Sequence, residues 1–169
     1  MTPRGLRRSA IAAAMWIGST TLAGPAARAL PSPASPSADE RARSSFQTGY
    51  RHQQAQQYED AILAYEESLR RDPNQAEALS NLGFCYKALK RYQKAIGYYK
   101  DAIRLKPDLA EAHEYLGEAY LELGRIPLAE REYNTLVTLK SDEADELKEK
   151  IAAKRAAMDG PGDPDAKAP

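Results

Sequence analysis

The organisation of this chain follows from residues 76–109, AEALSNLGFCYKALKRYQKAIGYYKDAIRLKPDL. Apolar residues recur there at spacings of three and four on both sides of Leu89-Lys90-Arg91, which predicts two amphipathic helices joined by a tight turn. The pattern returns when the frame is shifted by 34 residues, so that Gly83 aligns with Gly49 and Gly117. This period is typical of a helical solenoid, in which neighbouring units must stack to make a core. The sequence therefore predicts an all-α fold of three stacked helix pairs.

The central copy carries a specific set of residues at fixed spacing. They are Leu79, Leu82, Gly83, Tyr86, Ala95, Tyr99, Ala102 and Pro107. In this order they resemble the tetratricopeptide repeat consensus at all eight of its defining positions. The resemblance covers residues 41–143 as three repeats, 42–75, 76–109 and 110–143. It implies a right-handed superhelical solenoid of antiparallel helix pairs.

The two end copies depart from this consensus. Repeat 1 has Ser45, Thr48 and His52 at positions where repeat 2 has large side chains, so we expect its first helix to pack less firmly. Repeat 3 has Ser141 where the other repeats have a proline. These departures affect only how the first and the last repeat of the array are capped.

Residues 144–158 after the third repeat predict a capping helix. Leu147 and Ile151 fall on one side of it. The charged residues assigned elsewhere on this helix are Glu146, Lys148, Glu149, Lys150 and Lys154. One apolar stripe beside a charged surface suits a helix that closes the end of an array. Residues 159–169, DGPGDPDAKAP, have the composition of a disordered tail.

The first 29 residues have the three parts of a bacterial-type signal peptide. A basic start ends at Arg8, an apolar core runs over residues 10–17, and Ala27-Arg28-Ala29 forms an Ala-x-Ala site. We expect cleavage after Ala29 and export to the periplasm or the extracellular space.

Two alternatives to this signal assignment stay open. Because no charged residue lies between Arg8 and Arg28, the segment also fits an uncleaved anchor in the inner membrane. The Arg7-Arg8 pair leaves the twin-arginine export route open beside the general one. Residues 30–40, rich in Pro, Ser and Ala, predict a linker between the signal and the repeats.

The charges exclude an electrostatic attraction to nucleic acid. The chain has 24 basic and 24 acidic residues, and loss of the four arginines in the signal leaves 20 against 24, a net charge of −4. The remaining basic residues are dispersed among acids, so we expect no nucleic-acid partner. Cys85 is the single cysteine, which excludes an intramolecular disulfide, and we expect it to be a small core residue.

No constellation of residues indicates catalysis, a metal or a cofactor. His113-Glu114 opens like the zinc motif His-Glu-x-x-His, but Gly117 stands where the second histidine belongs. Glutamates recur along one face of the same predicted helix at positions 111, 114, 118 and 122. We interpret them as a solvated charge run, without apolar surroundings that would raise a pKa. The chain is therefore predicted not to be an enzyme.

The resemblance implies a concave groove lined by the first helix of each repeat. Its predicted partner-binding residues are Arg43, Phe46, Tyr50, Gln53, Glu77, Asn81, Phe84, Lys87, Glu111, Glu114, Tyr115 and Glu118. Phe46, Tyr50, Phe84 and Tyr115 are expected to form an aromatic floor, and the glutamates to give one end a negative field. An alternative is that Phe46 and Phe84 only pack between repeats. Of the clamp with which some family members hold a chaperone's terminal carboxylate, only Asn81 is present.

These features predict an exported adaptor or scaffold that binds a protein or peptide segment, apolar or basic in character, within an envelope-associated complex. Contact with a membrane is expected only through an uncleaved signal segment. The alternative is a structural protein that forms homo-oligomers by stacking its end surfaces, as arrays with incomplete caps do.

Overall fold

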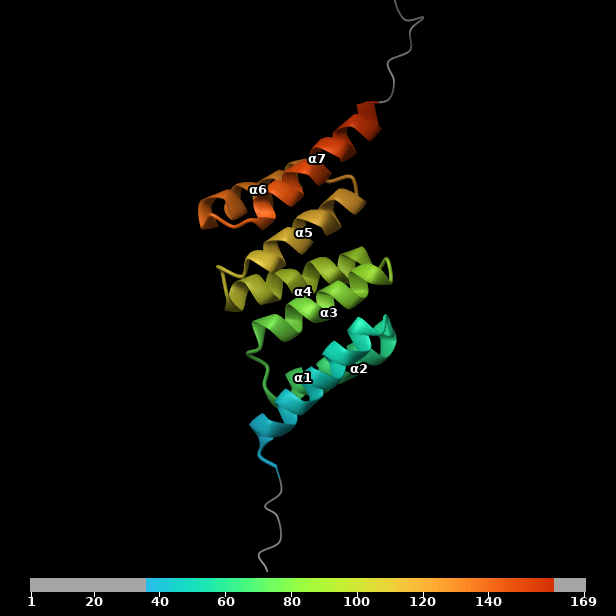
Figure 1. Ribbon diagram of the computed structural model, residues 1–169, viewed down its shortest axis with the longest axis vertical. Coiled ribbons are helices and arrows are strands. Elements are labelled where there is room, and N and C mark those ends of the chain that lie inside the picture. Colours follow the sequence, from blue (N-terminus) through green and yellow to red (C-terminus); the bar gives the residue numbers. More distant parts are fainter. Residues whose placement is uncertain (1–35, 160–169) are drawn as a thin grey trace, which may run out of the picture. The chain divides into compact units, whose positions relative to one another are not determined.

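The computed structural model describes residues 36–159, which form seven α-helices and no strands (Figure 1). The helices are α1 (Ala38–Gln54), α2 (Tyr58–Arg71), α3 (Ala76–Ala88), α4 (Tyr92–Leu105), α5 (Ala110–Glu122), α6 (Ile126–Leu139) and α7 (Glu143–Asp159). Each helix packs on the next one along the chain, and α5 also packs on α7. The predicted all-α array of three helix pairs with a terminal helix is confirmed. Among the described residues, no helix has the length and apolar character needed to cross a membrane.

The backbone itself repeats with the period found in the sequence. Gln56, Lys90 and Gly124, which are 34 residues apart, have left-handed φ angles of 58°, 58° and 69°. In the central copy, the N–H of Arg91 then donates to the carbonyl of Tyr86 at 2.8 Å. This arrangement satisfies carbonyl groups that the helix end would otherwise leave without partners. It ends each first helix at the predicted turn.

Small residues let the two helices of a pair approach closely, as predicted. A Cβ atom built on Gly83 would lie 2.7 Å from Cε1 of Tyr99, and Ala95 is completely buried. The third pair differs, because a Cβ on Gly117 would meet the side chain of Leu147 in α7. The capping helix thus fills the place that a tyrosine of the second helix fills in the earlier repeats.

The first repeat has a polar outer side. Ser45, Thr48 and His52 are half-buried, whereas the central repeat buries Leu82 and Tyr86 at two of the equivalent positions. Helix α1 buries two residues and α3 buries seven, although α1 packs on α2 along its length. No repeat covers α1 within the described residues, so polar side chains suit this end of the array.

The start of α1 corrects the predicted boundary of the linker. Ser37 is the N-cap: its hydroxyl accepts a hydrogen bond from the N–H of Glu40 at 3.1 Å, and the Glu40 carboxylate accepts one from the N–H of Ser37 at 2.6 Å. This capping box begins the helix at Ala38, so residues 38–40 are helical and not linker. The predicted signal peptide, residues 30–35 of the linker and residues 160–169 lie outside the described part of the chain.

A left-handed residue replaces the missing proline between α6 and α7. Lys140 has a φ angle of 56°, and the N–H of Ser141 donates to the carbonyl of Leu136 at 3.1 Å. The chain then enters α7, where Leu147 and Ile151 are buried against the last helix pair. The predicted capping helix and its apolar stripe are confirmed.

Candidate functional site

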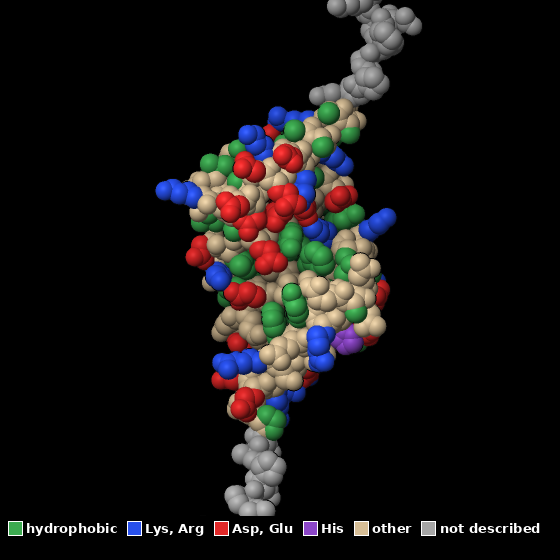
Figure 2. All heavy atoms as spheres, viewed as in Figure 1, with side chains coloured by type: hydrophobic (Ala, Val, Ile, Leu, Met, Phe, Trp, Pro, Cys, Tyr) green, Lys and Arg blue, Asp and Glu red, His purple; other side chains and the backbone are tan. Residues whose placement is uncertain are grey.

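The first helices of successive pairs lie side by side and form one face with α7. Two hollows open between odd-numbered helices, one of about 610 Å³ between α3, α5 and α7 and one of about 400 Å³ between α1 and α3. Figure 2 shows hydrophobic side chains gathered over the middle of the stack, with acidic and basic side chains intermixed over α5 and α7. We refer to this face as the groove.

The twelve predicted groove residues all lie on α1, α3 and α5, but they differ in exposure. Exposed residues are Arg43, Tyr50 and Glu77. Half-buried residues are Phe46, Gln53, Asn81, Phe84, Lys87, Glu111, Tyr115 and Glu118. Glu114 is buried, with only 7% of its surface exposed. A bound segment can therefore contact most of this set directly, but not Glu114.

Several polar groove residues already have partners within the fold, and Gln53 and Glu77 are the first two. The Tyr65 hydroxyl donates to Oε1 of Gln53 at 2.8 Å, which holds α1 against α2. Glu77 pairs with Lys106 at 2.8 Å, between the start of α3 and the end of α4. Both side chains therefore help to hold helices together, a use that the repeat pattern does not reveal.

The aromatic residues form a pair in the middle of the groove and a separate contact at its start. Phe84 and Tyr115 lie with ring centroids 5.4 Å apart, and Phe84 also contacts Tyr58 of the first repeat at 6.3 Å. Phe46 packs instead on Tyr65 of its own repeat, at 5.6 Å. Phe84 thus bridges three repeats and still keeps part of its ring exposed. Tyr50, with 48% of its surface exposed, packs least of all.

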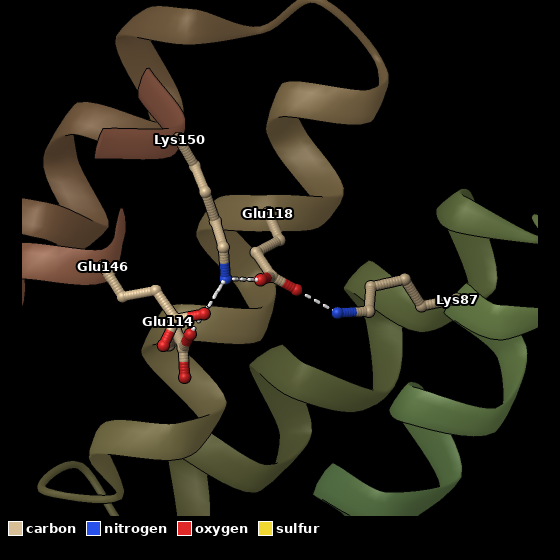
Figure 3. Close-up of polar contacts among 5 residues, drawn as sticks. All are labelled: Lys87, Glu114, Glu118, Glu146 and Lys150. Carbon is tan, nitrogen blue, oxygen red and sulfur yellow. Dashed lines mark hydrogen bonds and ion pairs between the residues drawn. The ribbon is translucent and has the colours of Figure 1, made fainter. Parts of the chain in front are cut away.

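A chain of ion pairs crosses the groove from α3 to α7 (Figure 3). Lys87 and Lys150 donate to different oxygens of the Glu118 carboxylate. Lys150 also donates to Glu146 at 2.6 Å and to Glu114 at 3.2 Å. The network therefore ties the second repeat to the third and the third to the capping helix.

Aromatic rings support the Lys87 end of this network. The Lys87 ammonium lies 4.5 Å from the Tyr115 centroid and 5.4 Å from that of Phe84. Such cation–π contacts add to the ion pair, because the ring faces carry partial negative charge. Lys87 thus occupies an aromatic and acidic environment within the groove.

The network corrects two expectations about the glutamates. The predicted negative field is partly neutralised. Both Lys87 and Lys150 pair with Glu118, and Lys150 also pairs with Glu114. The surroundings are also drier than a solvated charge run, because Glu114 is buried, and this burial raises its pKa. Burial acts the same way on Glu118, but hydrogen bonds from Lys150 and Lys87 outweigh it and lower its pKa.

The carboxylates of Glu114, Glu118 and Glu146 lie close enough together to suggest a metal site. The Lys150 ammonium, however, is bonded to all three of them. It already supplies the positive charge that the cluster needs, so the cluster acts as an ion-pair network between α5 and α7.

Glu111 differs from its neighbours because the lysines of the groove pair with other acids. Lys87 and Lys150 form ion pairs with Glu118, Glu114 and Glu146, so Glu111 has no basic partner among residues 36–159. Burial first and the nearby Glu111 carboxylate next raise the pKa of the Tyr115 hydroxyl. The pKa of Tyr65 is also raised, first by burial and then by Cys85, Tyr50 and Glu111. Glu111 and the Tyr115 hydroxyl therefore lie close together in the groove, whereas Tyr65 is buried in the core.

The fold and the groove together define a helical repeat protein whose first helices form one continuous face. Two family models of the tetratricopeptide repeat match the chain, over residues 46–110 and 88–153. These matches together span more than half of the sequence, and the chain belongs to the tetratricopeptide repeat family. None of the curated proteins compared with the chain matches it.

Solved structures agree with this family assignment. The first repeat domain of Spaghetti (RPAP3), bound to the HSP90 peptide SRMEEVD, is 22% identical with a TM-score of 0.64, covering 70% of this chain and 96% of that one. The TPR2B domain of yeast Sti1 in its pHsp70 complex is 21% identical with a TM-score of 0.64, covering 68% and 98%. The second repeat domain of human RPAP3, in complex with the HSP70 peptide SGPTIEEVD, is 24% identical with a TM-score of 0.64, covering 69% and 98%. At these identities the likeness concerns the fold.

Proposed function

We propose that this protein is an exported adaptor that binds an extended segment of a partner protein along α1, α3 and α5. The observation that carries the proposal is the row of aromatic side chains left partly exposed in the groove. Tyr50, Phe84 and Tyr115 keep exposed surface that stacking of the repeats does not require. The solved neighbours bound to chaperone peptides support a peptide as the occupant.

The charges of the groove favour a basic side chain at its centre. Glu111 has no basic partner among the described residues and lies beside the Tyr115 hydroxyl. A lysine or arginine of the partner would pair with this carboxylate and lie against the ring of Tyr115, much as Lys87 lies against it from within the chain. An acidic segment such as the EEVD end of the neighbours' peptides would be repelled there.

The larger hollow favours an apolar side chain at another position of the bound segment. Ala88, Leu121, Ala153 and Ala157 contribute small or apolar surface to it, between α3, α5 and α7. A side chain of leucine or phenylalanine size would bury its surface there without displacing the ion pairs at the rim. The proposed ligand is thus a segment that combines basic and apolar residues.

The location proposed for this activity is outside the cytoplasm. Support comes from the sequence of residues 1–29, with its basic start, apolar core and Ala-x-Ala site. The adaptor would be free in the periplasm or outside the cell if cleavage follows Ala29. It would stay tethered to the inner membrane if the segment is retained, and in either form it would join an envelope-associated complex.

The test uses the chain without residues 1–29 as bait in an envelope extract. We expect capture of a defined partner by this protein, and loss of that partner with the double variant Tyr50→Ala, Phe84→Glu. Leu63→Glu is the matched control, because Leu63 is 65% exposed on α2 and is not among the groove residues. Unchanged capture by a folded double variant would show that the groove does not bind the partner.

A direct measurement then tests the preferred chemistry. Labelled synthetic peptides that alternate leucine with lysine are compared with peptides that alternate leucine with glutamate, by fluorescence anisotropy. Tighter binding of the lysine series, lost with Glu111→Lys, is expected. Equal binding of both series, or a preference for glutamate, would contradict the proposed basic segment and leave the groove itself in place.

A further inference from the structure

His113 is a buried histidine whose two ring nitrogens both contact hydrogen-bond acceptors. It lies on α5, with 6% of its surface exposed, at a position where the central repeat has Leu79. Its Nδ1 is 2.8 Å from a carboxylate oxygen of Glu132 on α6. Its Nε2 is 3.0 Å from the carbonyl oxygen of Pro107, in the connection between α4 and α5. The ring therefore joins three segments of the fold.

The chemistry of these two acceptors decides the protonation of the ring. A neutral imidazole has one N–H and one lone pair, so it can donate to only one of them. A carbonyl oxygen cannot donate, and an ionised carboxylate cannot either. A neutral ring would thus place a nitrogen lone pair against an oxygen lone pair in a buried site. An imidazolium donates to both acceptors and leaves no polar atom without a partner.

We infer that His113 is held as a buried cation that braces α5 against α6 and the α4–α5 connection, and that this brace opens when the ring loses a proton. The inference does not depend on the proposed peptide binding. It assigns to His113 a pH-sensitive role that the consensus position, normally occupied by a large apolar residue, does not have.

The charges around the ring agree with a cation. From α6 the facing charged group is Glu132, which is itself only 16% exposed. The α4–α5 connection contributes a backbone carbonyl and no ionised side chain to the contact. The hydrogen bond to Glu132 raises the pKa of His113, burial lowers it, and the carbonyl of Pro107 raises it again, with a net rise above the ordinary value.

The direction of the pH effect follows from this rise. Because the folded-state pKa of His113 lies above its unfolded value, the brace contributes full stability below the unfolded pKa, about 6.5. That contribution is lost as the pH rises through the folded pKa. The same helix carries Glu111 and Tyr115 in the groove.

An NMR titration of the chain without residues 1–29 tests the inference. His52→Gln leaves His113 as the single histidine, whose ring resonance is followed against pH. We expect its midpoint to lie above that of a histidine in an unstructured peptide, and Glu132→Gln to lower it. A midpoint at or below the peptide value would overturn the inference.

Thermal unfolding provides a second readout. Between pH 6 and 9 the protein is expected to lose stability relative to His113→Leu, which restores an apolar side chain at this position. If the melting temperatures of the two proteins change with pH in parallel, the inference that His113 acts as a brace is overturned. If His113→Leu does not fold, His113→Gln replaces it, because glutamine donates without titrating in this range.

Discussion

The ring of Tyr99 in α4 lies directly against the backbone of Gly83 in α3, with no space for a side chain between them. A methyl group on Gly83 would come within 2.7 Å of the ring, whose atoms are fixed in the core. Gly83→Ala should therefore destabilise the domain. Overpacking costs about 1–3 kcal/mol, and the better helix propensity of alanine returns up to about 1 kcal/mol. A net loss of about 1–2 kcal/mol is expected in urea unfolding.

Gly97 provides the matched control for this prediction. It lies in α4, and a Cβ atom there would meet nothing within 4 Å. Gly97→Ala should thus raise stability by about 0.5–1 kcal/mol, through backbone entropy alone. Equal effects of the two substitutions would show that the contact between Gly83 and Tyr99 does not limit packing.

Glu118 should be the most costly of the groove carboxylates to neutralise. It accepts hydrogen bonds from Lys87 and Lys150, two cations that would lose their common partner in Glu118→Gln. Hydrogen bonds to charged groups contribute about 1.5–3 kcal/mol, so we expect a loss of this order. Glu149→Gln is the control, because Glu149 is exposed on α7. Chemical denaturation of both variants at neutral pH measures the difference.

The same carboxylate should contribute to unfolding in acid. Its folded-state pKa lies below the unfolded value of about 4.5, so its stabilisation is present above that pH and is lost as the pH falls through the lowered pKa. Stability measured from pH 6 down to pH 3 should fall more steeply for the natural chain than for Glu118→Gln. Identical slopes would show that the pairs with Lys87 and Lys150 do not persist in solution.

Most of the fold could be predicted from local spacing, since Gly83, Ala95 and Tyr99 recur with a period that only stacked helix pairs explain. The turn after α3 and the apolar stripe of α7 follow from the same reasoning. The composition of residues 30–40 predicts a later start for α1 than the structure shows, although Ser37 and Glu40 have the Ser-x-x-Glu spacing of a capping box.

The charge pattern of the groove could not be predicted in the same way. The sequence pattern places Lys150 on the charged surface of the capping helix, but its ammonium reaches Glu118, 32 residues earlier in the chain. Which side chains of α7 turn towards α5 depends on how the two helices pack, and the pattern along α7 does not contain that information. Glu114 is buried beside α7 for the same reason, so the spacing of the glutamates along α5 predicts more solvation than the structure shows.

Cys85 should react slowly with thiol reagents for as long as the domain is folded. It is completely buried, and burial raises its pKa to about 12. A rise of this size leaves roughly 1,000-fold less thiolate at neutral pH than in a free cysteine. Labelling with a maleimide should thus be slow in buffer and complete within the mixing time in denaturant. Rapid labelling of the folded protein would place Cys85 at an accessible site instead.

The polar outer side of α1 should keep copies of this protein from stacking end to end. Ser45 and Thr48 align with Leu79 and Leu82 of the central repeat and stay half-buried, and α1 packs only on α2 and α3 among the described helices. Ser45→Leu with Thr48→Leu would create an apolar surface suited to another array. Sedimentation velocity of the chain without residues 1–29 should show a monomer for the natural sequence and self-association for the double variant. Self-association of the natural sequence that Thr48→Lys abolishes would instead support assembly through this end, because a buried charge would then disrupt an existing interface.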